Sequence, residues 1–316
     1  MTTLVVGAGM VGAEALRQLS QQGERAIAYE RFPLDENLAG LASSIELIVA
    51  DVQNLARLVE TIQVHRVSRI LHTVALVGPA AEASAYEAYR TNVTGSVNVL
   101  EAARLAGVRR VVFYSSNAIF DPDGGDAPFD EDYPKKPAGM NGAAKLCVEH
   151  IGEIYARSHG LEFVSLRIGG VYGPGRSSGG VPQQMRACVE AHLRGQAYVM
   201  QKYVYTGRND MITAFDAARA GLCVLEAARP ARLAYNIGTG EAFSYEELAA
   251  AMQRLLPALR IEVREAGQPV TIGLRPMQTA RAVAELGFRT AEPFAIGFPK
   301  FVEWVRSVSG LEGKRA

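Results

Sequence analysis

Residues 2–12 read Thr-Thr-Leu-Val-Val-Gly-Ala-Gly-Met-Val-Gly, a short apolar run that leads into three closely spaced glycines. The apolar run predicts a buried strand, and residues 13–22 predict a helix directly after the glycines. Glycines so placed permit a tight turn, close approach of the backbone to a pyrophosphate, and close packing of the helix on the strand, with the phosphates at the helix N-terminus. A glycine-rich turn without a ligand is the alternative. The stretch predicts a dinucleotide-binding βα unit whose cofactor contacts come from Gly7, Gly9, Met10, Val11 and Gly12.

A second apolar run, Arg25–Tyr29, ends at Glu30 and Arg31. An acidic side chain at that place fits the hydroxyls of an adenosine ribose and repels a 2′-phosphate. The neighbouring arginine instead fits a 2′-phosphate, or it forms an ordinary surface ion pair. Glu30 and Arg31 are therefore both cofactor candidates, and together they favour NAD while leaving NADP open.

Apolar strands and helical patterns alternate along the first half of the chain. The patterns predict strands at 45–50, 69–74, 110–115 and 162–167, and helices at 54–64, 86–106 and 141–158. Such alternation predicts an α/β Rossmann fold, a doubly wound parallel sheet covered by helices on both faces. Glycine and proline become frequent from 169 to 182, where the regular pattern breaks. We predict a dinucleotide-binding Rossmann domain from residues 1–167 with 209–238, and a smaller C-terminal substrate-binding α/β region from residues 168–208 with 239–316.

Composition narrows the class of protein further. The 316 residues are 48% hydrophobic and 21% charged, and their formal net charge is zero. Such a chain can bury a full core, and its charge balance gives no reason to expect nucleic acid or an anionic membrane as a partner. Neither a secretory signal nor a membrane span is visible. Three widely spaced cysteines, Cys147, Cys188 and Cys223, predict reduced core thiols of a cytoplasmic protein rather than disulfides or a metal site. The partner that we expect is a small-molecule substrate.

Several further motifs follow one another in a fixed order. They are Asp51-Val52, His72–Ala75, Thr91–Ala103, Tyr114–Ala118, Phe129–Pro134, Arg167–Gly175, Tyr235–Gly240 and Arg275–Gly287. Together with the glycine loop, these motifs resemble the extended short-chain dehydrogenase/reductase superfamily, in particular its branch of NAD-dependent epimerases and dehydratases that act on sugars and nucleotide sugars. The resemblance covers essentially the whole chain.

The resemblance implies further contacts to the cofactor. It implies Asp51 and Val52 at the adenine, and the remaining contacts from Thr73, Val74, Ala75, Asn92, Lys145 and Ile168. Asparagine is a poor helix former, which fits a polar role for Asn92, although a solvent-facing side chain is the alternative. The resemblance also implies a homodimer through the helix that ends near Leu105 and the helix that bears Lys145. Core packing against the sheet produces a similar apolar stripe.

One position departs from the family pattern. The catalytic segment of the family carries a tyrosine four residues before a lysine, so that both side chains lie on one helical face. Here Lys145 is in place and Asn141 stands where the tyrosine belongs. Asparagine does not exchange a proton near neutral pH, so the lysine's role at the ribose remains while the acid–base role of the tyrosine does not. With Ser116, which matches the active-site Ser/Thr of the family, Asn141 and Lys145 are the catalytic candidates.

Asn141 leaves three interpretations open. In the first, a redox enzyme obtains its proton from Lys145, from a water held by Ser116 and Asn141, or from a tyrosine near 172 or 203–205. In the second, the amide serves a different reaction by orienting a carbonyl or a water. In the third, the protein binds a dinucleotide as a sensor or partner protein and catalyses nothing. We predict an NAD(P)-dependent oxidoreductase or epimerase/dehydratase that acts on a hydroxyl or carbonyl substrate, either a sugar or a nucleotide sugar.

Candidate substrate residues are Ser116, Asn117, Arg208 and Arg275. Arg208 stands one place earlier than the family's arginine before an aspartate, whereas Arg275 resembles a diphosphate-binding arginine, because a guanidinium clamps phosphate oxygens bidentately. A surface ion pair is the alternative for Arg275. We interpret His72 as a structural histidine and the acidic cluster 130–132 as solvated surface without chemistry.

Overall fold

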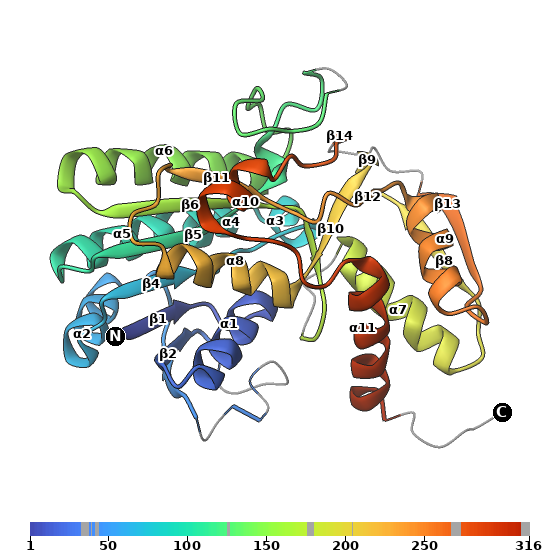
Figure 1. Cartoon of the computed structure of the whole chain (residues 1–316), viewed down its shortest axis with the longest axis horizontal. Coiled ribbons are helices and arrows are strands. Elements are labelled where there is room, and N and C mark those ends of the chain that lie inside the picture. The colour runs from blue at the N-terminus through green and yellow to red at the C-terminus, as the bar shows by residue number, and fades with distance from the viewer. Residues whose placement is uncertain are drawn as a thin grey trace.

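Seven parallel strands form the central sheet of this computed structural model, in the order β11-β6-β5-β4-β1-β2-β3 (Figure 1). The strands are β1 (Thr2–Val6), β2 (Arg25–Glu30), β3 (Glu46–Val49), β4 (Arg69–His72), β5 (Arg110–Ser116), β6 (Glu162–Ile168) and β11 (Ala234–Ile237). The structure describes all residues except 33–37, 39, 42–43, 125–126, 176–179, 204, 267–272 and 311–316. The strand order reverses between β1 and β4, and in open α/β sheets ligands bind beyond the carboxyl ends of the strands at such a point.

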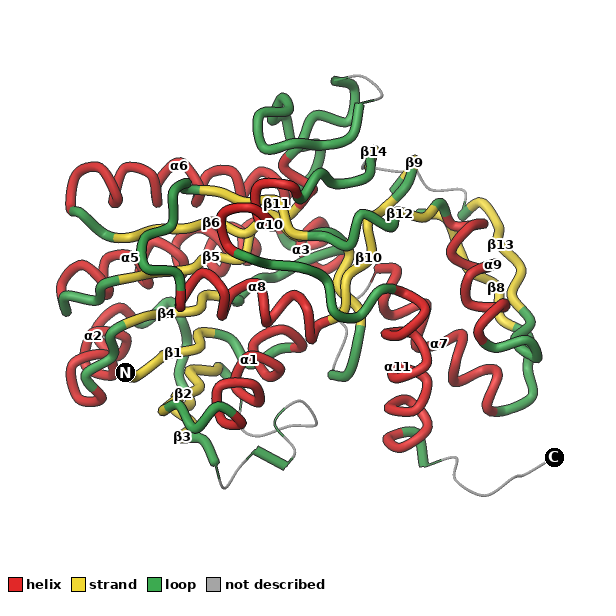
Figure 2. The backbone as a smooth tube through the Cα atoms, viewed as in Figure 1, coloured by secondary structure: helices red, strands yellow, loops and turns green. Residues whose placement is uncertain are grey.

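Helices cover both faces of this sheet, as the tube view shows (Figure 2). One face carries α1 (Met10–Gln21) and α8 (Ala214–Glu226); the other carries α2 (Leu55–His65), α5 (Gly95–Leu105) and α6 (Met140–His159). Val5 belongs to the core beneath α1 and α8, while Leu4 and Val6 belong to the core on the opposite face, because side chains alternate along a strand. The predicted doubly wound α/β fold is confirmed.

The helix predicted over 86–106 contains an irregularity. A π-helical turn, Arg90–Thr94, separates α4 (Ala85–Tyr89) from α5, and the short helix α3 (Pro79–Ala83) precedes α4. The Asn92 side chain is 1% exposed; its Oδ1 accepts from the Leu76 N–H at 2.7 Å and its Nδ2 donates to the Leu76 carbonyl at 2.8 Å. The alternative of a solvent-facing Asn92 is therefore wrong. Its amide fixes the segment that follows β4.

The remaining elements form a second, smaller region with its own core. Its strands are β7 (Gly170–Tyr172), β10 (Asn209–Thr213) and β12 (Ala242–Phe243) in one sheet, β8 (Tyr198–Lys202) with β13 (Ile261–Glu265), and β9 (Thr206–Gly207) with β14 (Gly273–Leu274). Its helices are α7 (Gly180–Leu193), α9 (Tyr245–Leu255) and α11 (Phe294–Val308), whereas α10 (Ala280–Leu286) packs on the core of the large sheet through Ala282 and Leu286. Within the predicted 209–238 segment, β11 joins the large sheet and α8 packs on it, while β10 pairs with β7 and β12. The division into two domains stays a prediction.

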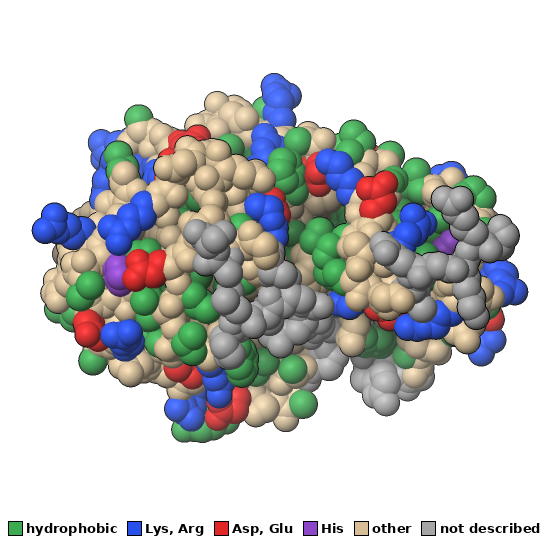
Figure 3. Space-filling view, turned by 90° about the horizontal axis from the view of Figure 1, so that it is seen from below, with side chains coloured by type: hydrophobic (Ala, Val, Ile, Leu, Met, Phe, Trp, Pro, Cys, Tyr) green, Lys and Arg blue, Asp and Glu red, His purple; other side chains and the backbone are tan. Residues whose placement is uncertain are grey.

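Surface features bear on the compositional predictions. Lys, Arg, Asp and Glu side chains are interspersed over the face seen in Figure 3. None of the described helices is long and apolar enough to cross a membrane, and the described residues contain no cluster of three His, Cys, Asp or Glu side chains that fits a metal ion. The three cysteines are free thiols, but the prediction of core thiols is wrong for Cys147, which is exposed on α6; Cys188 is buried and Cys223 half-buried. The cytoplasmic location stays a prediction.

Candidate functional site

The glycine loop between β1 and α1 is closely packed at Gly7 and Gly12 and open at Gly9. Gly7 adopts φ +96°, and a Cβ on Gly12 would collide with the Gly7 carbonyl oxygen, which also accepts a hydrogen bond from the Thr73 hydroxyl at 2.7 Å. A Cβ on Gly9 would meet nothing within 4 Å. Helix α1 begins next, at Met10 and Val11, so its free N–H groups border this open space. The loop fits a pyrophosphate.

The acidic residue at the end of β2 is held beside this loop. Glu30 Oε2 accepts from the Ala8 N–H at 2.7 Å, and Oε1 accepts from the Arg31 N–H at 2.8 Å. The Arg31 guanidinium lies 3.5 Å from the Asp51 carboxylate and is largely exposed, which agrees with the surface ion pair considered for it. A 2′-phosphate at this place would face the carboxylates of Glu30 and Asp51, so the geometry fits NAD better than NADP.

Asp51 and Val52 follow β3 and are fixed from two sides. The Tyr29 hydroxyl donates to the Asp51 carbonyl at 3.1 Å. The Asn98 side chain on α5 donates to the Val52 carbonyl at 3.2 Å, and a Cβ on Gly95 would lie 2.6 Å from the Val52 side chain. The backbone that resembles an adenine contact is thus anchored to α5.

Thr73, Val74 and Ala75 occupy the segment between β4 and Leu76, which Asn92 holds. A buried chain of hydrogen bonds supports that arrangement: His72 Nε2 lies 2.8 Å from Ser96 Oγ, and the Ser96 hydroxyl donates to the Asn92 carbonyl at 2.6 Å. Burial, with a smaller contribution from the Lys145 charge, lowers the pKa of His72 to about 3. A neutral, hydrogen-bonded imidazole agrees with the structural interpretation of His72.

The first turns of α6 carry Asn141 and Lys145. Lys145 is 4% exposed; its Nζ donates to the Tyr114 carbonyl at 2.6 Å and lies 4.5 Å from the centre of the Phe113 ring. Burial lowers the pKa of this amine to about 7, although the Glu149 carboxylate partly offsets the effect. Asn141 Oδ1 is buried and has no hydrogen-bond partner among the described residues. The site thus holds an unpaired acceptor four residues before a buried amine.

Ser116 lies close to this turn. It ends β5, where its Oγ accepts from the Ala118 N–H at 3.1 Å, and its register partner on β6 is Ile168. A Cβ on Gly142 would collide with the Ala118 carbonyl oxygen, so α6 packs directly on the turn that follows Ser116. The structure therefore brings the catalytic candidates Ser116, Asn141 and Lys145 to one edge of the sheet.

The tyrosines considered as proton donors lie elsewhere. Tyr172 is fully buried with its ring against Phe294 and Phe301, and burial raises the pKa of its phenol. The Tyr205 hydroxyl donates to the Phe243 carbonyl at 2.9 Å, and burial raises its pKa as well. Both rings belong to the core of the second region, which argues against either as the proton donor. In the run 203–205, Tyr203 is half-buried and residue 204 lies outside the described part of the chain.

The predicted substrate residues are connected through the second region. The Asn117 amide donates to Asn209 Oδ1 at 3.2 Å, and the neighbouring Arg208 N–H donates to the Leu274 carbonyl at 3.1 Å. This pairing places Arg208 beside Arg275, which is distant in sequence. Arg208 Nε also donates to the Ala242 carbonyl and lies 3.1 Å from the Glu247 carboxylate; Arg275 Nη2 lies 3.4 Å from the Pro122 carbonyl oxygen.

Two acidic residues have roles that sequence reasoning missed. Asp210 is fully buried, and its carboxylate accepts from the Thr239 N–H at 2.8 Å and the Gly240 N–H at 3.0 Å; burial nevertheless raises its pKa to about 6. Glu131 is buried and accepts from the Asn236 N–H at 3.0 Å, so the interpretation of the 130–132 cluster as solvated is wrong for Glu131. Asp210 directly follows Arg208 and Asn209 in the sequence. This position was the sequence signal that could have identified Asp210 as a residue near the site.

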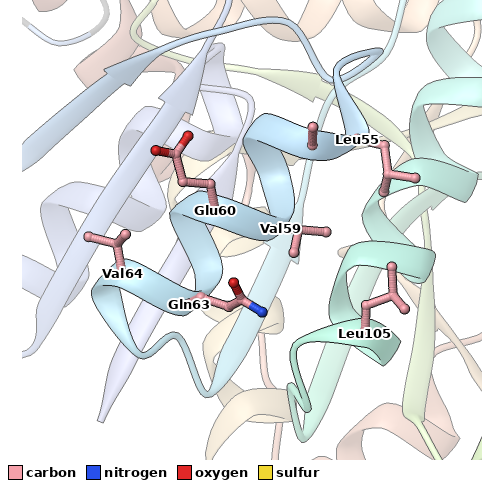
Figure 4. A pocket seen from close by; sticks show the side chains of 7 residues that line it. Leu55, Val59, Glu60, Gln63, Val64 and Leu105 are labelled. Carbon is pink, nitrogen blue, oxygen red and sulfur yellow. The ribbon is translucent and has the colours of Figure 1, made fainter.

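A third missed residue lies on α3. Glu82 Oε1 accepts from the Met140 N–H at 2.9 Å, which places a carboxylate at the first turn of α6. No periodicity or motif in the sequence marks this residue. An apolar groove lies between α2 and α5, lined by Leu55, Val59, Val64, Leu105 and their neighbours (Figure 4). None of the predicted site residues lines it.

The fold and the loop define a dinucleotide-binding α/β protein. Residues 3–238 match the profile of the NAD dependent epimerase/dehydratase family. The match extends over more than half of the chain, and the chain belongs to this family. This result confirms the predicted family, and it confirms at family level the expectation of an NAD-dependent enzyme.

Individual relatives agree with this assignment. The chain is 29% identical over 329 residues to a UDP-glucose 4-epimerase of Mycolicibacterium smegmatis, an alignment that covers 98% of this chain and all of the relative. It is similar to the structure of MoeE5 in complex with UDP-glucose and NAD, with 27% identity, a TM-score of 0.84, and coverage of 98% and 100% of the two chains. A UDP-glucose 4-epimerase structure from Thermotoga maritima, at 22% identity and TM-score 0.86 over 98% and 100% of the chains, shows the shared fold.

Proposed function

We propose that this protein binds NAD and catalyses the epimerisation or dehydration of a nucleotide sugar, beginning with oxidation of a sugar hydroxyl. The observation that carries the proposal is the meeting of Ser116, Asn141 and Lys145 at the sheet edge that also bears the glycine loop. When bound, NAD supplies a hydride acceptor. The chain's own residues must bind it, orient the sugar and move a proton.

Cofactor binding rests on a set of residues that fit the parts of NAD. The loop and the first turn of α1 suit the pyrophosphate, and Glu30 with Asp51 suits the adenosine half. The segment 73–75, held by Asn92, and Ile168 at the end of β6 would flank the nicotinamide half. Lys145 would donate to the ribose there, a role that a buried amine with three donors can fill.

Nucleotide-sugar binding is supported by the paired arginines and by the relatives. Arg208 and Arg275 directly follow the neighbouring strands β9 and β14, and a guanidinium suits a diphosphate because it can bind phosphate oxygens bidentately. Asn117 links this pair, through Asn209, to the turn after Ser116. A UDP-sugar lying between the two would place its sugar near Asn141.

Within the site, Ser116 and Asn141 would orient the reacting hydroxyl. Ser116 is a hydroxyl donor and acceptor, and the unpaired Oδ1 of Asn141 needs a donor such as a substrate O–H or a water. An asparagine there orients the substrate but moves no proton. This is why the site is non-standard for its family.

We also propose that two copies associate through α4, α5 and α6. These helices expose large apolar side chains, namely Tyr86 at 70%, Tyr89 at 53%, Leu105 at 50% and Ile154 at 48%. The double variant Tyr89→Asp with Ile154→Asp should convert a dimer to a monomer in light scattering coupled to size exclusion, while Val64→Asp on α2 should not. A monomeric parent protein would refute the dimer.

Calorimetric titration with NAD and with NADP tests the cofactor, followed by incubation of the complex with UDP-glucose or dTDP-glucose and analysis of the sugar products. We expect tight binding of NAD, weak binding of NADP and conversion of one of the sugars. Absence of NAD binding in protein free of co-purified cofactor would overturn the proposal. NAD binding without conversion of any nucleotide sugar would instead favour the sensor or partner protein, which Asn141 also permits.

A further inference from the structure

The carboxylate of Glu82 contacts the backbone one residue before Asn141, the position at which the family tyrosine is missing. Glu82 lies on α3, a short helix between β4 and α4, and its Oε1 accepts from the Met140 N–H at 2.9 Å. Met140 is the first residue of α6 and immediately precedes Asn141. A side chain at position 139 would crowd this carboxylate, because a Cβ there would lie 2.9 Å from Glu82 Oε1. Gly139 therefore allows α3 to bring an acid against the first turn of α6.

The Glu82 carboxylate is open to solvent. Glu82 is exposed, and among the described residues no lysine or arginine forms an ion pair with it, whereas surface glutamates such as Glu60 pair with a neighbouring arginine. An accessible carboxylate that no cationic side chain neutralises can accept a proton from a bound molecule. Asn141, the residue after Met140, presents a buried acceptor without a partner among the described residues, so an orienting group directly follows the residue that the Glu82 carboxylate contacts.

The other titratable groups of the site are committed elsewhere. The Lys145 amine is buried and donates to the Tyr114 carbonyl, and the Asp210 carboxylate accepts from the backbone of Thr239 and Gly240. The phenols of Tyr172 and Tyr205 lie in the second core. Of the groups considered, Glu82 is the one that combines a position at Asn141 with access from outside.

We infer that Glu82 performs the proton transfer that a tyrosine at position 141 performs in relatives, with Asn141 orienting the sugar hydroxyl. The inference rests on the proposed function. In the forward step the O–H bond breaks and its proton passes to a Glu82 carboxylate oxygen, the carbonyl C=O forms, and the C–H bond breaks with its electron pair leaving as hydride to the nicotinamide cofactor. The reverse step returns hydride to carbon and the proton from Glu82 to oxygen. Sugar and cofactor together conserve atoms and electrons.

A labelling experiment tests the location of Glu82 without relying on turnover. The protein is treated with a water-soluble carbodiimide and glycine ethyl ester, free and with NAD plus UDP-glucose, and modified carboxylates are quantified by peptide mass spectrometry. We expect Glu82 to be modified in the free protein and protected in the complex, while Glu60 on α2 reacts equally in both. Equal labelling of Glu82 in the two samples, when calorimetry shows that UDP-glucose binds, overturns the inference.

Substitutions then test the proton transfer. In Glu82→Gln the side chain keeps an acceptor for the Met140 N–H but cannot take up a proton, so its melting temperature should match that of the parent. Its rate of nicotinamide reduction by UDP-glucose should fall by about a hundred- to ten-thousand-fold, the usual contribution of a general base. Glu60→Gln is the matched control and should leave the rate unchanged.

Restoring the tyrosine gives the decisive comparison. Asn141→Tyr supplies a phenol at the family position. In that background, Glu82→Gln should lower the rate far less than the same substitution lowers it in the parent protein. If Glu82 is only a helix cap, Glu82→Gln will be as active as the parent, or its loss will be equal in both backgrounds, and either result overturns the inference. If the parent binds neither NAD nor UDP-glucose, the proposed function itself fails and the role of Glu82 fails with it.

Discussion

The region of the large sheet and the second region differ in the side chains that build their cores. Beneath the helices of the large sheet the buried residues are mainly alanine, valine, leucine and isoleucine, whereas the second core is rich in phenylalanine, tyrosine and methionine. Its rings stack directly, as in Tyr205 on Tyr245 at 4.6 Å between centroids and Phe294 on Phe298 at 5.3 Å. Methionine fills irregular space and adapts readily. The core of the large sheet is thus packed mainly by aliphatic side chains, whereas the second core is packed by rings and methionines of varied shape.

The binding surfaces follow the same division. The loop that fits NAD is backbone, defined by glycines whose absent side chains leave space. The substrate surface that we propose is formed by side chains from segments far apart in sequence, such as Arg208 and Arg275, joined through backbone contacts. A binding surface made of main-chain atoms keeps its shape when side chains are substituted. A binding surface made of side chains changes its specificity when those side chains are substituted. If the second region binds the substrate as we propose, substrate choice is set mainly by its side chains.

The largest effect should come from adding one methyl group to the glycine loop. In Gly12→Ala the new Cβ would collide with the Gly7 carbonyl oxygen, so we expect a lower melting temperature and no measurable binding of NAD by calorimetry. Gly9→Ala is the matched control, because its Cβ meets nothing in the free protein. The Gly9→Ala variant should have the melting temperature of the parent, but its affinity for NAD should be lower. Unimpaired NAD binding by Gly9→Ala would show that the pyrophosphate lies elsewhere.

A cavity in the second core should show whether the two regions bind their ligands independently. Phe298→Ala removes a fully buried ring and should lower the free energy of unfolding by about 3–5 kcal/mol. If the regions bind their ligands independently, the folded variant should keep the parent's affinity for NAD and lose affinity for UDP-glucose, both measured by calorimetry below the melting temperature. Parallel loss of both affinities would contradict the comparison drawn here.

Removal of one guanidinium should affect only the substrate. Charged hydrogen bonds contribute about 1.5–3 kcal/mol, so Arg275→Ala should raise KM for the nucleotide sugar about ten- to a hundredfold without changing NAD affinity. Arg275→Lys should recover part of the loss, because it keeps the charge and loses the planar fork. An unchanged KM in Arg275→Ala would assign this side chain to the surface ion pair instead.

The smallest effect concerns pH. Burial lowers the pKa of Lys145 from its ordinary 10.5 to about 7, so the unfolded chain binds more protons between these values and the free protein should become more stable as pH rises through that window. The gain is at most about 1.4 kcal/mol per pH unit. Chemical unfolding at pH 7 and pH 8 should show it in the parent and not in Lys145→Met. Equal pH dependence of the two proteins would mean that the amine is solvated in solution.

Sequence predicted the cofactor region well because its signals are local. The glycine spacing, the alternating strands and the segment from Asn141 to Lys145 each lie within a few residues, and the fold and family they predicted are confirmed. The site residues themselves stay predictions, although the structure gathers them at one edge. Glu82, Glu131 and Asp210 were missed because their roles depend on partners far along the chain, namely Met140, Asn236 and Thr239. The break at Arg90–Thr94 was missed because a π-helical turn keeps a helical pattern of side chains.

That π-helical turn has a consequence for how the chain tolerates changes in length. It holds one residue more than a regular turn, and it gives the Asn92 amide both of its bonds to Leu76. Deleting a single residue there would restore an ordinary helix and swing everything before it by about 100° relative to α5. The Asn92 side chain could then not bind Leu76 while α4 kept its present position. The extra residue of this turn therefore acts as a spacer whose loss would disturb the segment after β4.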